Sequence, residues 1–206
     1  MKALKLFVIR HGETDFSRER RFAGARDVPL SARGRLQAEA VAAALAAEPL
    51  AAVYTSPLER ARASAELIAK PHGVEPRPAP DFREMAFGEW EGLLRDELAS
   101  RQPSHATAWR DTPHLASPPG GERLVDVAAR VEAAIARLRD HHAGATVAVV
   151  THAIVTRLIV LSALGLPPER LWSVDASPAG ITEIEYQGAW VTMHRMNTLA
   201  HLDATP

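Results

Sequence analysis

Residues 6–14 read Leu6-Phe7-Val8-Ile9-Arg10-His11-Gly12-Glu13-Thr14, and the rest of the chain is interpreted from this stretch. Its apolar, β-forming run stops abruptly at Arg10, which predicts a buried strand that delivers a guanidinium and an imidazole into a loop. Gly12 would allow the backbone to approach a ligand closely. Because ligands of open α/β sheets bind at the carboxyl ends of the strands, we expect a binding site here.

Further segments have the character of strands. Residues 51–55 form a short apolar run, and residues 146–150 are almost continuously β-branched, as in a central strand buried on both faces. Thr151-His152 ends the second run and repeats the strand-then-histidine arrangement of the opening stretch. A closing hairpin is predicted over residues 180–186 and 189–196.

Helical patterns alternate with these strands. Ser31 caps a predicted helix over residues 32–47, with Leu36 on its apolar face. Ser56-Pro57-Leu58-Glu59 has the form of a capping box with proline at the first helical position, so a second helix is expected from Pro57 to Ala69. Two more helices are predicted. One has apolar positions from Leu124 to Leu138 and ends in residues 141–144, and the other runs from His152 to about Leu164. This alternation predicts an α/β fold, a single three-layer domain over residues 1–206 with a mostly parallel central sheet flanked by helices.

Residues 85–121 form a predicted insertion that covers the site. The insertion contains helix-like pieces at residues 93–99 and 104–110, and its last part is rich in proline and glycine. We expect Trp90 and Trp109 to pack under the insertion rather than to form a substrate platform. Substrate specificity is also expected to arise from this segment.

Composition excludes several kinds of protein. Hydrophobic residues make up 47% and charged residues 24% of the 206 positions, which is ordinary for a globular protein. The net charge of -1 argues against a general nucleic-acid or membrane-surface binder, so any bound anion needs a local cationic cluster. The absence of cysteine excludes thiolate catalysis and zinc-thiolate sites. No signal-peptide pattern precedes residue 14 and residues 153–166 are too few to span a bilayer, so we expect a cytoplasmic protein.

Three strand-to-helix junctions carry the candidate chemistry. They supply Arg10 with His11, Arg60 near the start of its helix, and His152. Two guanidiniums and two imidazoles at one edge of a sheet suit a phosphoryl group, because arginine forks match its oxygens and an imidazole can attack phosphorus. No Gly-x-Ser-x-Gly elbow or Walker loop offers a competing chemistry.

Phosphoryl transfer from an alcohol also needs a proton donor, since an alkoxide is a poor leaving group. Glu84 is the leading candidate, with Glu13 and Glu89 behind it. The alternative for Glu84 is a structural ion pair with Arg83 or a solvent-facing carboxylate.

Six short motifs lie in order along nearly the whole chain. They are Arg10–Thr14, Thr55–Ala61, Phe87–Gly92, Pro119–Glu122, Val149–His152 and Asn197–Leu202. With them the sequence resembles the phosphoglycerate-mutase-like histidine phosphatase superfamily. The resemblance implies the fold of that superfamily and a mechanism through phosphohistidine that uses no metal or other cofactor.

The resemblance also implies a role for each catalytic residue. His11 would be the nucleophile, and Arg10, Arg60 and His152 would bind the phosphoryl oxygens and stabilise their charge. Glu84 would protonate the leaving alcohol and then help water to attack the intermediate.

Four more residues match positions that bind substrate in the family, and three of these positions depart from its pattern. Ser17 stands where an asparagine usually helps to hold phosphate, and Ala23 precedes Gly24 where a polar residue is common. Ala153-Ile154 follows His152 where glycines are typical. None of these departures removes a catalytic group, so the catalytic interpretation stands.

Three functions are compatible with the residues. The favoured one is a metal-independent phosphatase that hydrolyses a small phosphorylated metabolite. The second is a cofactor-dependent phosphoglycerate mutase, but such members tend to be longer and to carry a basic lid, whereas residues 93–118 offer only Arg95, Arg101 and Arg110. The third is a phosphate-binding module without catalysis.

The sequence predicts the reaction but does not identify the substrate or the oligomeric state. A broad-specificity phosphatase, a ribazole phosphatase and a sugar-phosphate phosphatase would share these motifs, so the substrate stays open. The apolar tail over residues 181–196 offers an edge contact for a homodimer, and the sequence leaves the oligomeric state open.

Overall fold

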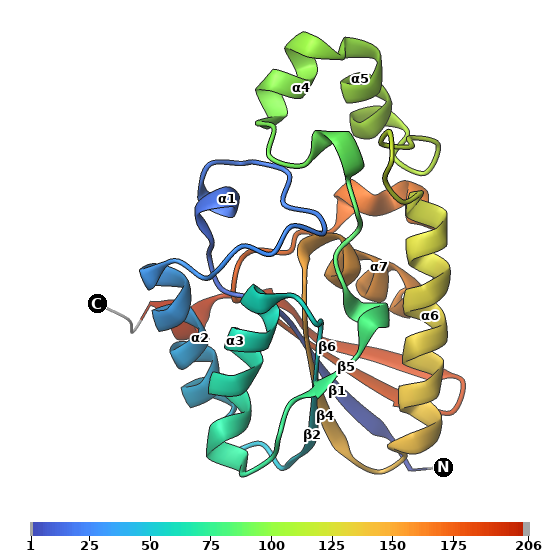
Figure 1. Ribbon diagram of the computed structural model, residues 1–206. Helices are drawn as coiled ribbons and strands as arrows, with labels where there is room; N and C mark the ends of the chain where they lie inside the picture. Colours follow the sequence, from blue (N-terminus) through green and yellow to red (C-terminus); the bar gives the residue numbers. More distant parts are fainter. Residues whose placement is uncertain (1, 204–206) are drawn as a thin grey trace.

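A computed structural model describes residues 2–203, and these form one α/β domain built on a six-stranded sheet (Figure 1). The strand order is β3-β2-β4-β1-β5-β6, in which β3, β2, β4 and β1 run parallel and β5 and β6 are antiparallel to their neighbours. The strands are β1 (Leu4–Arg10), β2 (Leu50–Thr55), β3 (Arg77–Pro78), β4 (Thr146–Thr151), β5 (Ile181–Gln187) and β6 (Trp190–Thr198). The predicted α/β class with a mostly parallel sheet is therefore confirmed. The ends of the predicted domain, residue 1 and residues 204–206, lie outside the described part.

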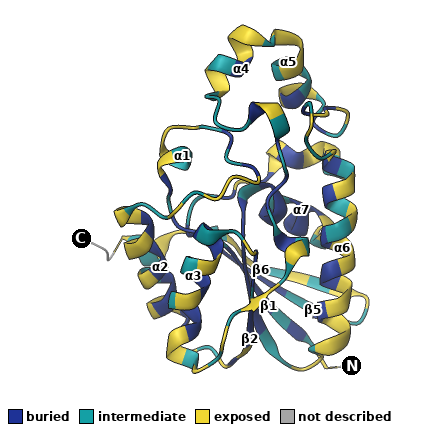
Figure 2. Ribbon diagram, viewed as in Figure 1, coloured by how far each residue is buried: buried dark blue, intermediate teal, exposed yellow. Residues whose placement is uncertain are grey.

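Helices cover both faces of the sheet and make it the middle of three layers. Figure 1 shows α2 and α3 on one side and α6 and α7 on the other, and Figure 2 shows buried strands between helices whose outer faces are exposed. The α-helices are α1 (Asp15–Arg18), α2 (Ala32–Leu45), α3 (Glu59–Ala69), α4 (Arg95–Arg101), α5 (Pro103–Asp111), α6 (Leu124–His141) and α7 (Ala153–Ala163). The short 3-10 helices are η1 (Lys70–His72), η2 (Pro80–Phe82), η3 (Gly88–Trp90), η4 (Pro168–Ser173) and η5 (Ala200–Leu202). Within residues 2–203, no helix combines the length and apolarity needed to cross a membrane.

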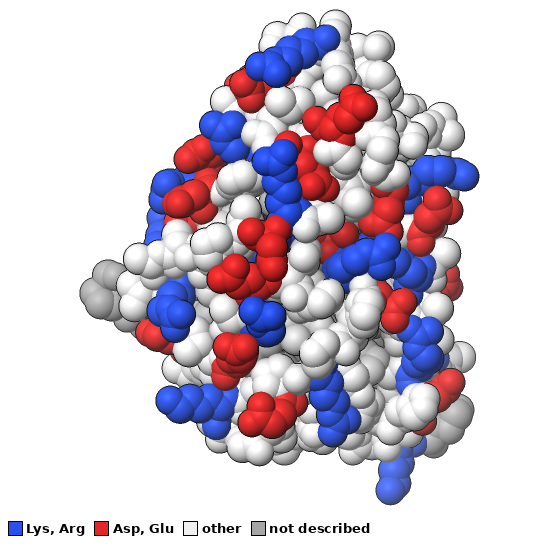
Figure 3. Space-filling view, viewed as in Figure 1, with Lys and Arg blue, Asp and Glu red and all other residues white. Residues whose placement is uncertain are grey.

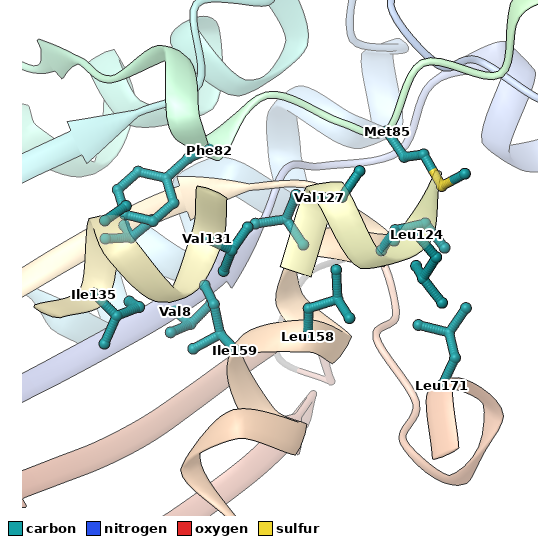
Figure 4. Packing of buried hydrophobic residues seen from close by; sticks show 14 of the residues in the cluster. Val8, Phe82, Met85, Leu124, Val127, Val131, Ile135, Leu158, Ile159 and Leu171 are labelled. Atoms are coloured by element: carbon teal, nitrogen blue, oxygen red, sulfur yellow. The ribbon is translucent and has the colours of Figure 1, made fainter. Parts of the chain in front are cut away.

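Alternate residues of β1 belong to two separate cores. Val8 packs on the face covered by α6 and α7, and Figure 4 shows it beside Val131 and Ile159. Phe7 and Ile9 belong to the core under α2 and α3. All three β1 side chains are at most 1% exposed, as expected for a strand buried on both faces. Burial on both faces fixes the register of β1, because a slip of one residue would exchange the two sets of side chains.

The register of the central strands brings three loops to one edge of the sheet. Arg10 pairs with Thr151 across β1 and β4, and Thr55 of β2 pairs with Val150 of β4. The ladder continues by one hydrogen bond beyond the strands, because the N–H of His11 donates to the Thr151 carbonyl over 2.9 Å. The residues that follow β1, β2 and β4 therefore emerge side by side.

The predicted capping box at Ser56 is wrong. Helix α3 begins at Glu59, two residues later than the box requires, and its N-cap residue Leu58 offers no side-chain cap. The Glu59 N–H is instead bonded at 2.6 Å to a carboxylate oxygen of Asp27, which lies on a distant loop. The Ser56 hydroxyl is within 2.7 Å of Nε2 of His152. The hydroxyl also accepts from the Leu58 N–H at 3.3 Å, ahead of the helix, so the serine contacts both a site residue and the preceding turn without capping α3 itself.

Helix α2 confirms its predicted cap, and Val41 and Leu45 of its predicted apolar face are buried, but Leu36 is not. The Ser31 hydroxyl accepts a hydrogen bond of 3.0 Å from the Gly34 N–H. Leu36, however, is 46% exposed, while Gln37 is buried and its side-chain oxygen accepts from the Glu13 N–H at 2.8 Å. The helix is rotated so that Gln37 can hold the loop after β1.

Gly12 allows close packing between two segments of backbone. A Cβ added at Gly12 would lie 2.1 Å from the Gly34 carbonyl oxygen in α2. The absence of side chains on both glycines thus lets α2 pack directly on the loop that carries His11. The expectation that Gly12 also lets the backbone approach a ligand stays a prediction.

The segment after residue 85 lies above the carboxyl edge of the sheet, where α4 and α5 form the top of the molecule in Figure 1. Its core is aromatic: the rings of Phe87 and Trp109 meet edge to face at 5.3 Å between centroids, and Phe22 lies 5.0 Å from Phe87. Trp90 is fully buried against this cluster. Packing is therefore the role of Trp90, as expected. Helix α1 and the two-residue strand β3 were not predicted, because both are too short to show a periodic pattern.

Candidate active site

Side chains from the ends of β1 and β4 and from α3 meet at the carboxyl edge of the sheet. The rings of His11 and His152 lie 5.0 Å apart between centroids at an angle of 62°. The Nε atom of Arg60 lies 3.3 Å from Nε2 of His11. All three side chains are at most 4% exposed. The structure thus brings together the groups that the sequence placed at three separate junctions.

The hydrogen bonds of His11 fix its tautomer. Its Nδ1 lies 2.7 Å from the Gly12 carbonyl oxygen, which can only accept, so Nδ1 carries the proton. Arg60 donates to Nε2, which therefore carries a lone pair rather than a hydrogen. Burial, with Arg60 and Arg10 adding to it, lowers the pKa of His11 well below its usual value. The imidazole is accordingly neutral at pH 7 and can act as a nucleophile at Nε2.

The two arginines are held by backbone carbonyls. Arg60 donates to the carbonyls of Arg26 and Gly24 at 2.7 and 2.9 Å, and Arg10 donates to that of Ala176 at 2.7 Å. Burial lowers the pKa of Arg10 to about 10, although Glu84 opposes the shift, so the guanidinium stays charged at neutral pH. Within residues 2–203, Nε of Arg10 has no hydrogen-bond partner. This buried N–H can donate to an anion bound in the site.

His152 is fully buried, and its ring lies beside that of His11. Its Nε2 is 2.7 Å from the Ser56 hydroxyl, and its Nδ1 is buried without a partner among the described residues. Burial first, then the charge of Arg60, lowers the pKa of His152 well below its usual value. The ring is therefore neutral at pH 7 and offers one nitrogen for a further hydrogen bond.

Glu84 is the carboxylate that reaches the site. It is 7% exposed, and its two oxygens accept from the N–H groups of Met85 at 3.0 Å and of Ile154, at the start of α7, at 3.3 Å. The alternative ion pair with Arg83 is not formed, because Arg83 bonds to Glu122 at 2.8 Å.

The two other candidate acids lie elsewhere. Glu13 accepts from the Ser31 hydroxyl at 2.9 Å, and Glu89 is exposed. Neither lines the cavity next to His11, which leaves Glu84 as the candidate donor.

A cavity of about 80 Å³ lies over the His11 ring. Its walls include all but one of the residues predicted from sequence: Arg10, His11, Ser17, Ala23, Gly24, Arg60, Glu84 and Ala153. The exception is His152, which packs against His11 but does not line the cavity. A cavity with two arginines, an unprotonated imidazole nitrogen and a carboxylate in its walls suits a phosphoryl group bonded to an alcohol.

Ser17 takes a local role that explains how α1 forms. Its hydroxyl accepts from the Thr14 N–H, and its N–H donates to the Thr14 hydroxyl at 3.1 Å, which makes a capping box at the start of α1. The serine still lines the cavity, but its hydroxyl is already engaged with the backbone of Thr14. Its use as a phosphate ligand stays a prediction.

Sequence reasoning missed several walls of the cavity. They are Thr14, Arg21, Phe22, Phe87, Arg95, Trp109, Ile154, Arg157 and Trp172. One signal was available for Arg157, which lies four residues after Ala153 in an otherwise apolar helix and so shares its face. No local pattern marks Phe22 or Trp172, because each joins the cavity from a separate segment.

The visible surface of the described residues has no cationic cluster like the one in the cavity next to His11. Figure 3 shows both signs of charge interspersed over the face in view, and the chain as a whole has a net charge of -1. Among residues 2–203, no three His, Asp or Glu side chains gather as potential metal ligands. The described cations of the site are thus its arginines.

Comparison with known proteins agrees with the geometry. The family model described as the histidine phosphatase superfamily (branch 1) matches residues 6–199. Phosphoserine phosphatase 1 of Hydrogenobacter thermophilus is 31% identical over 97% of this chain and 94% of its own length. The "Probable phosphoglycerate mutase GpmB" of Photorhabdus laumondii is 30% identical over 97% of this chain and 95% of its own length.

A solved structure extends the agreement to the fold. Bacillus stearothermophilus YhfR has a TM-score of 0.91 and 33% identity, with 97% of this chain and 99% of that chain covered. The matched residues include the loops that carry Arg10, His11, Arg60, Glu84 and His152. The chain belongs to the histidine phosphatase superfamily.

Proposed function

We propose that this chain is a phosphatase that hydrolyses small phosphomonoesters through a phosphohistidine at His11, without a metal ion. The observation that carries the proposal is the state of His11. Its Nδ1 proton is bound by the Gly12 carbonyl, its Nε2 is unprotonated, and Nε2 faces a guanidinium at 3.3 Å. A neutral nucleophile beside fixed positive charge is what attack on a phosphate dianion requires.

In the first step, Nε2 of His11 attacks phosphorus and the bond to the leaving oxygen breaks. Arg10 and Arg60 balance the negative charge on the phosphoryl oxygens as it shifts, which is the largest contribution a protein makes to such reactions. Glu84, in its protonated form, gives its proton to the leaving oxygen, so an alcohol departs instead of an alkoxide.

In the second step, water attacks the phosphorus of phosphohistidine. Glu84, now ionised, takes the proton of the water, and the bond from phosphorus to Nε2 breaks. The products are inorganic phosphate and neutral His11, with Glu84 protonated again. His152, whose ring lies 5.0 Å from that of His11, is assigned to binding the phosphoryl oxygens, as the family resemblance implies.

The positive charge of the arginines in the site supports the proposal that no metal ion is needed. A phosphoryl dianion needs about two positive charges in a buried site, and Arg10 and Arg60 supply them. The small cavity also favours a small substrate, with the leaving group projecting beyond it.

We propose that the protein is cytoplasmic. The homodimer predicted from its β5–β6 edge stays a prediction.

The mutase is the second candidate, because one relative carries that name. A mutase of this superfamily is expected to carry a basic lid that retains the phosphoenzyme. Of the three arginines in the inserted segment, only Arg95 lines the cavity, while Arg110 is bonded to Asp111 and Arg101 lies 3.5 Å from Glu97. This charge distribution supports hydrolysis over transfer. A binding module without catalysis would be expected to have lost His11 or Glu84.

The test is hydrolysis of para-nitrophenyl phosphate in excess chelator, in parallel with conversion of phosphoglycerate between its isomers. We expect release of phosphate that chelator does not change, and slower isomerisation than hydrolysis. Isomerisation faster than phosphate release would favour the mutase. Binding of phosphate esters without turnover would favour the binding module, and loss of activity in chelator would contradict metal independence.

A further inference from the structure

A second cavity lies beside the one that contains His11, under α4 and α5, and its volume is about 380 Å³. Its walls are mostly apolar: Phe22, Leu98, Ala99, Pro103, Ala106, Thr107, Trp109 and Trp172, with Arg95 and Arg110. Four of these residues, Phe22, Arg95, Trp109 and Trp172, also line the catalytic cavity. The two cavities are therefore neighbours with common walls.

The common walls are fixed in place. The indole N–H of Trp172 donates to the Trp109 carbonyl at 3.1 Å, and the two rings meet edge to face at 5.3 Å. The Arg157 guanidinium lies 5.0 Å from the centre of the Trp172 ring. Because its polar N–H is already bonded, Trp172 presents an apolar surface while 38% of it stays exposed.

The charged walls of the apolar cavity do not make it polar. Arg110 is bonded to Asp111 through two nitrogens at 2.7 and 2.9 Å. Arg95 lies at the boundary with the catalytic cavity and has no ion-pair partner among residues 2–203. Its methylene stem can line the cavity while its guanidinium stays near the phosphoryl group.

We infer that the apolar cavity is the subsite for the leaving group, so that preferred substrates are phosphomonoesters of alcohols that carry an aromatic or branched aliphatic group. This inference rests on the proposed function. A small phosphoryl cavity leaves the alcohol outside it. Of the two cavities that share walls with it, the apolar one is the space in which an apolar alcohol can lose contact with water. A single added methylene in such a pocket changes kcat/KM by about 10-fold or more.

The test compares propyl phosphate with phenylpropyl phosphate, whose leaving groups are alcohols of nearly equal acidity. We expect kcat/KM of the wild type to be at least about 10-fold higher for phenylpropyl phosphate. Thr107→Phe should reduce this ratio, because Thr107 lines the apolar cavity but not the catalytic one and a larger side chain would fill the space.

The matched control is Ser104→Phe. Ser104 lies on the same helix α5 and is exposed like Thr107, but it does not line the cavity, so its variant should keep the wild-type ratio. Thermal unfolding of both variants checks that each is folded.

Two outcomes would overturn the assignment of the leaving-group subsite while leaving the proposed phosphatase function intact. One is equal kcat/KM of the wild type for the two esters. The other is a stronger preference for phosphoserine that Thr107→Phe leaves unchanged, which would assign the leaving group to the adjoining polar cavity of about 770 Å³ that Arg95 and Arg157 also line. Failure of the wild type to hydrolyse any of these esters would overturn the proposed function together with the subsite.

Discussion

His11→Ala should abolish turnover, with kcat lower by about 10⁴-fold or more, as expected when the nucleophile of a covalent mechanism is removed. Alanine has no atom that can form the phosphoryl-enzyme bond, and the two arginines alone would only position substrate and water. The substrate should still bind, because Arg10 and Arg60 are held by backbone carbonyls that do not involve the imidazole. The measurement is steady-state hydrolysis of para-nitrophenyl phosphate together with phosphate binding by the variant.

Two further variants keep this result interpretable. His194→Ala removes an exposed histidine on β6 and should keep kcat within about 2-fold, since surface substitutions rarely perturb a distant site. His11→Asn retains a polar side chain in the buried position and should be inactive while its thermal unfolding stays cooperative. Turnover by His11→Ala within tenfold of the wild type would show that another group attacks phosphorus.

Glu84→Gln should reduce kcat/KM much more for esters whose leaving alcohol is weakly acidic than for esters whose leaving group is strongly acidic. For an alkyl phosphate, kcat/KM should fall by about 10²- to 10⁴-fold, because the departing oxygen no longer receives a proton. For para-nitrophenyl phosphate, kcat/KM should fall far less, since nitrophenolate leaves without protonation. Its kcat should nevertheless drop, because Glu84 is also needed when water attacks the intermediate.

The control for this prediction is Glu89→Gln, which changes an exposed carboxylate outside the cavity and should leave both esters unaffected. The amide of Glu84→Gln keeps the shape of the side chain and can still accept from the Met85 or Ile154 N–H. An equal loss of kcat/KM for the alkyl and the nitrophenyl ester would contradict a proton-donor role.

The central sheet and most of the site were predictable from sequence because their signals are local. The apolar runs before His11 and His152 identify β1 and β4, and parallel strands that end at the same edge must place these two histidines side by side. Arg60 was placed correctly although the start of its helix was not, since a residue in the first turn points toward the same edge in either case.

The predictions that failed concern residues whose contacts come from distant segments of the chain. Ser56 has a capping sequence, but the energy of its hydroxyl contact with His152 is not visible in a window of four residues. The cap of α3 comes instead from Asp27, which is 32 positions away. Similarly, the tautomer of His11 follows from the backbone position of Gly12, and the wall formed by Trp172 follows from its bond to Trp109. Such pairings are set by the fold and leave no periodic trace in the chain.

The most direct test of the account is detection of phosphohistidine at His11. Glu84→Gln is mixed with para-nitrophenyl phosphate, quenched in base and digested with trypsin, which cleaves after Arg10 and Arg18 and releases a peptide with a single histidine. We predict that mass spectrometry finds one phosphoryl group on this peptide, located at His11 by fragmentation, stable in base and lost in acid. Release of nitrophenol with no phosphopeptide, or with the phosphoryl group on another residue, would contradict the mechanism.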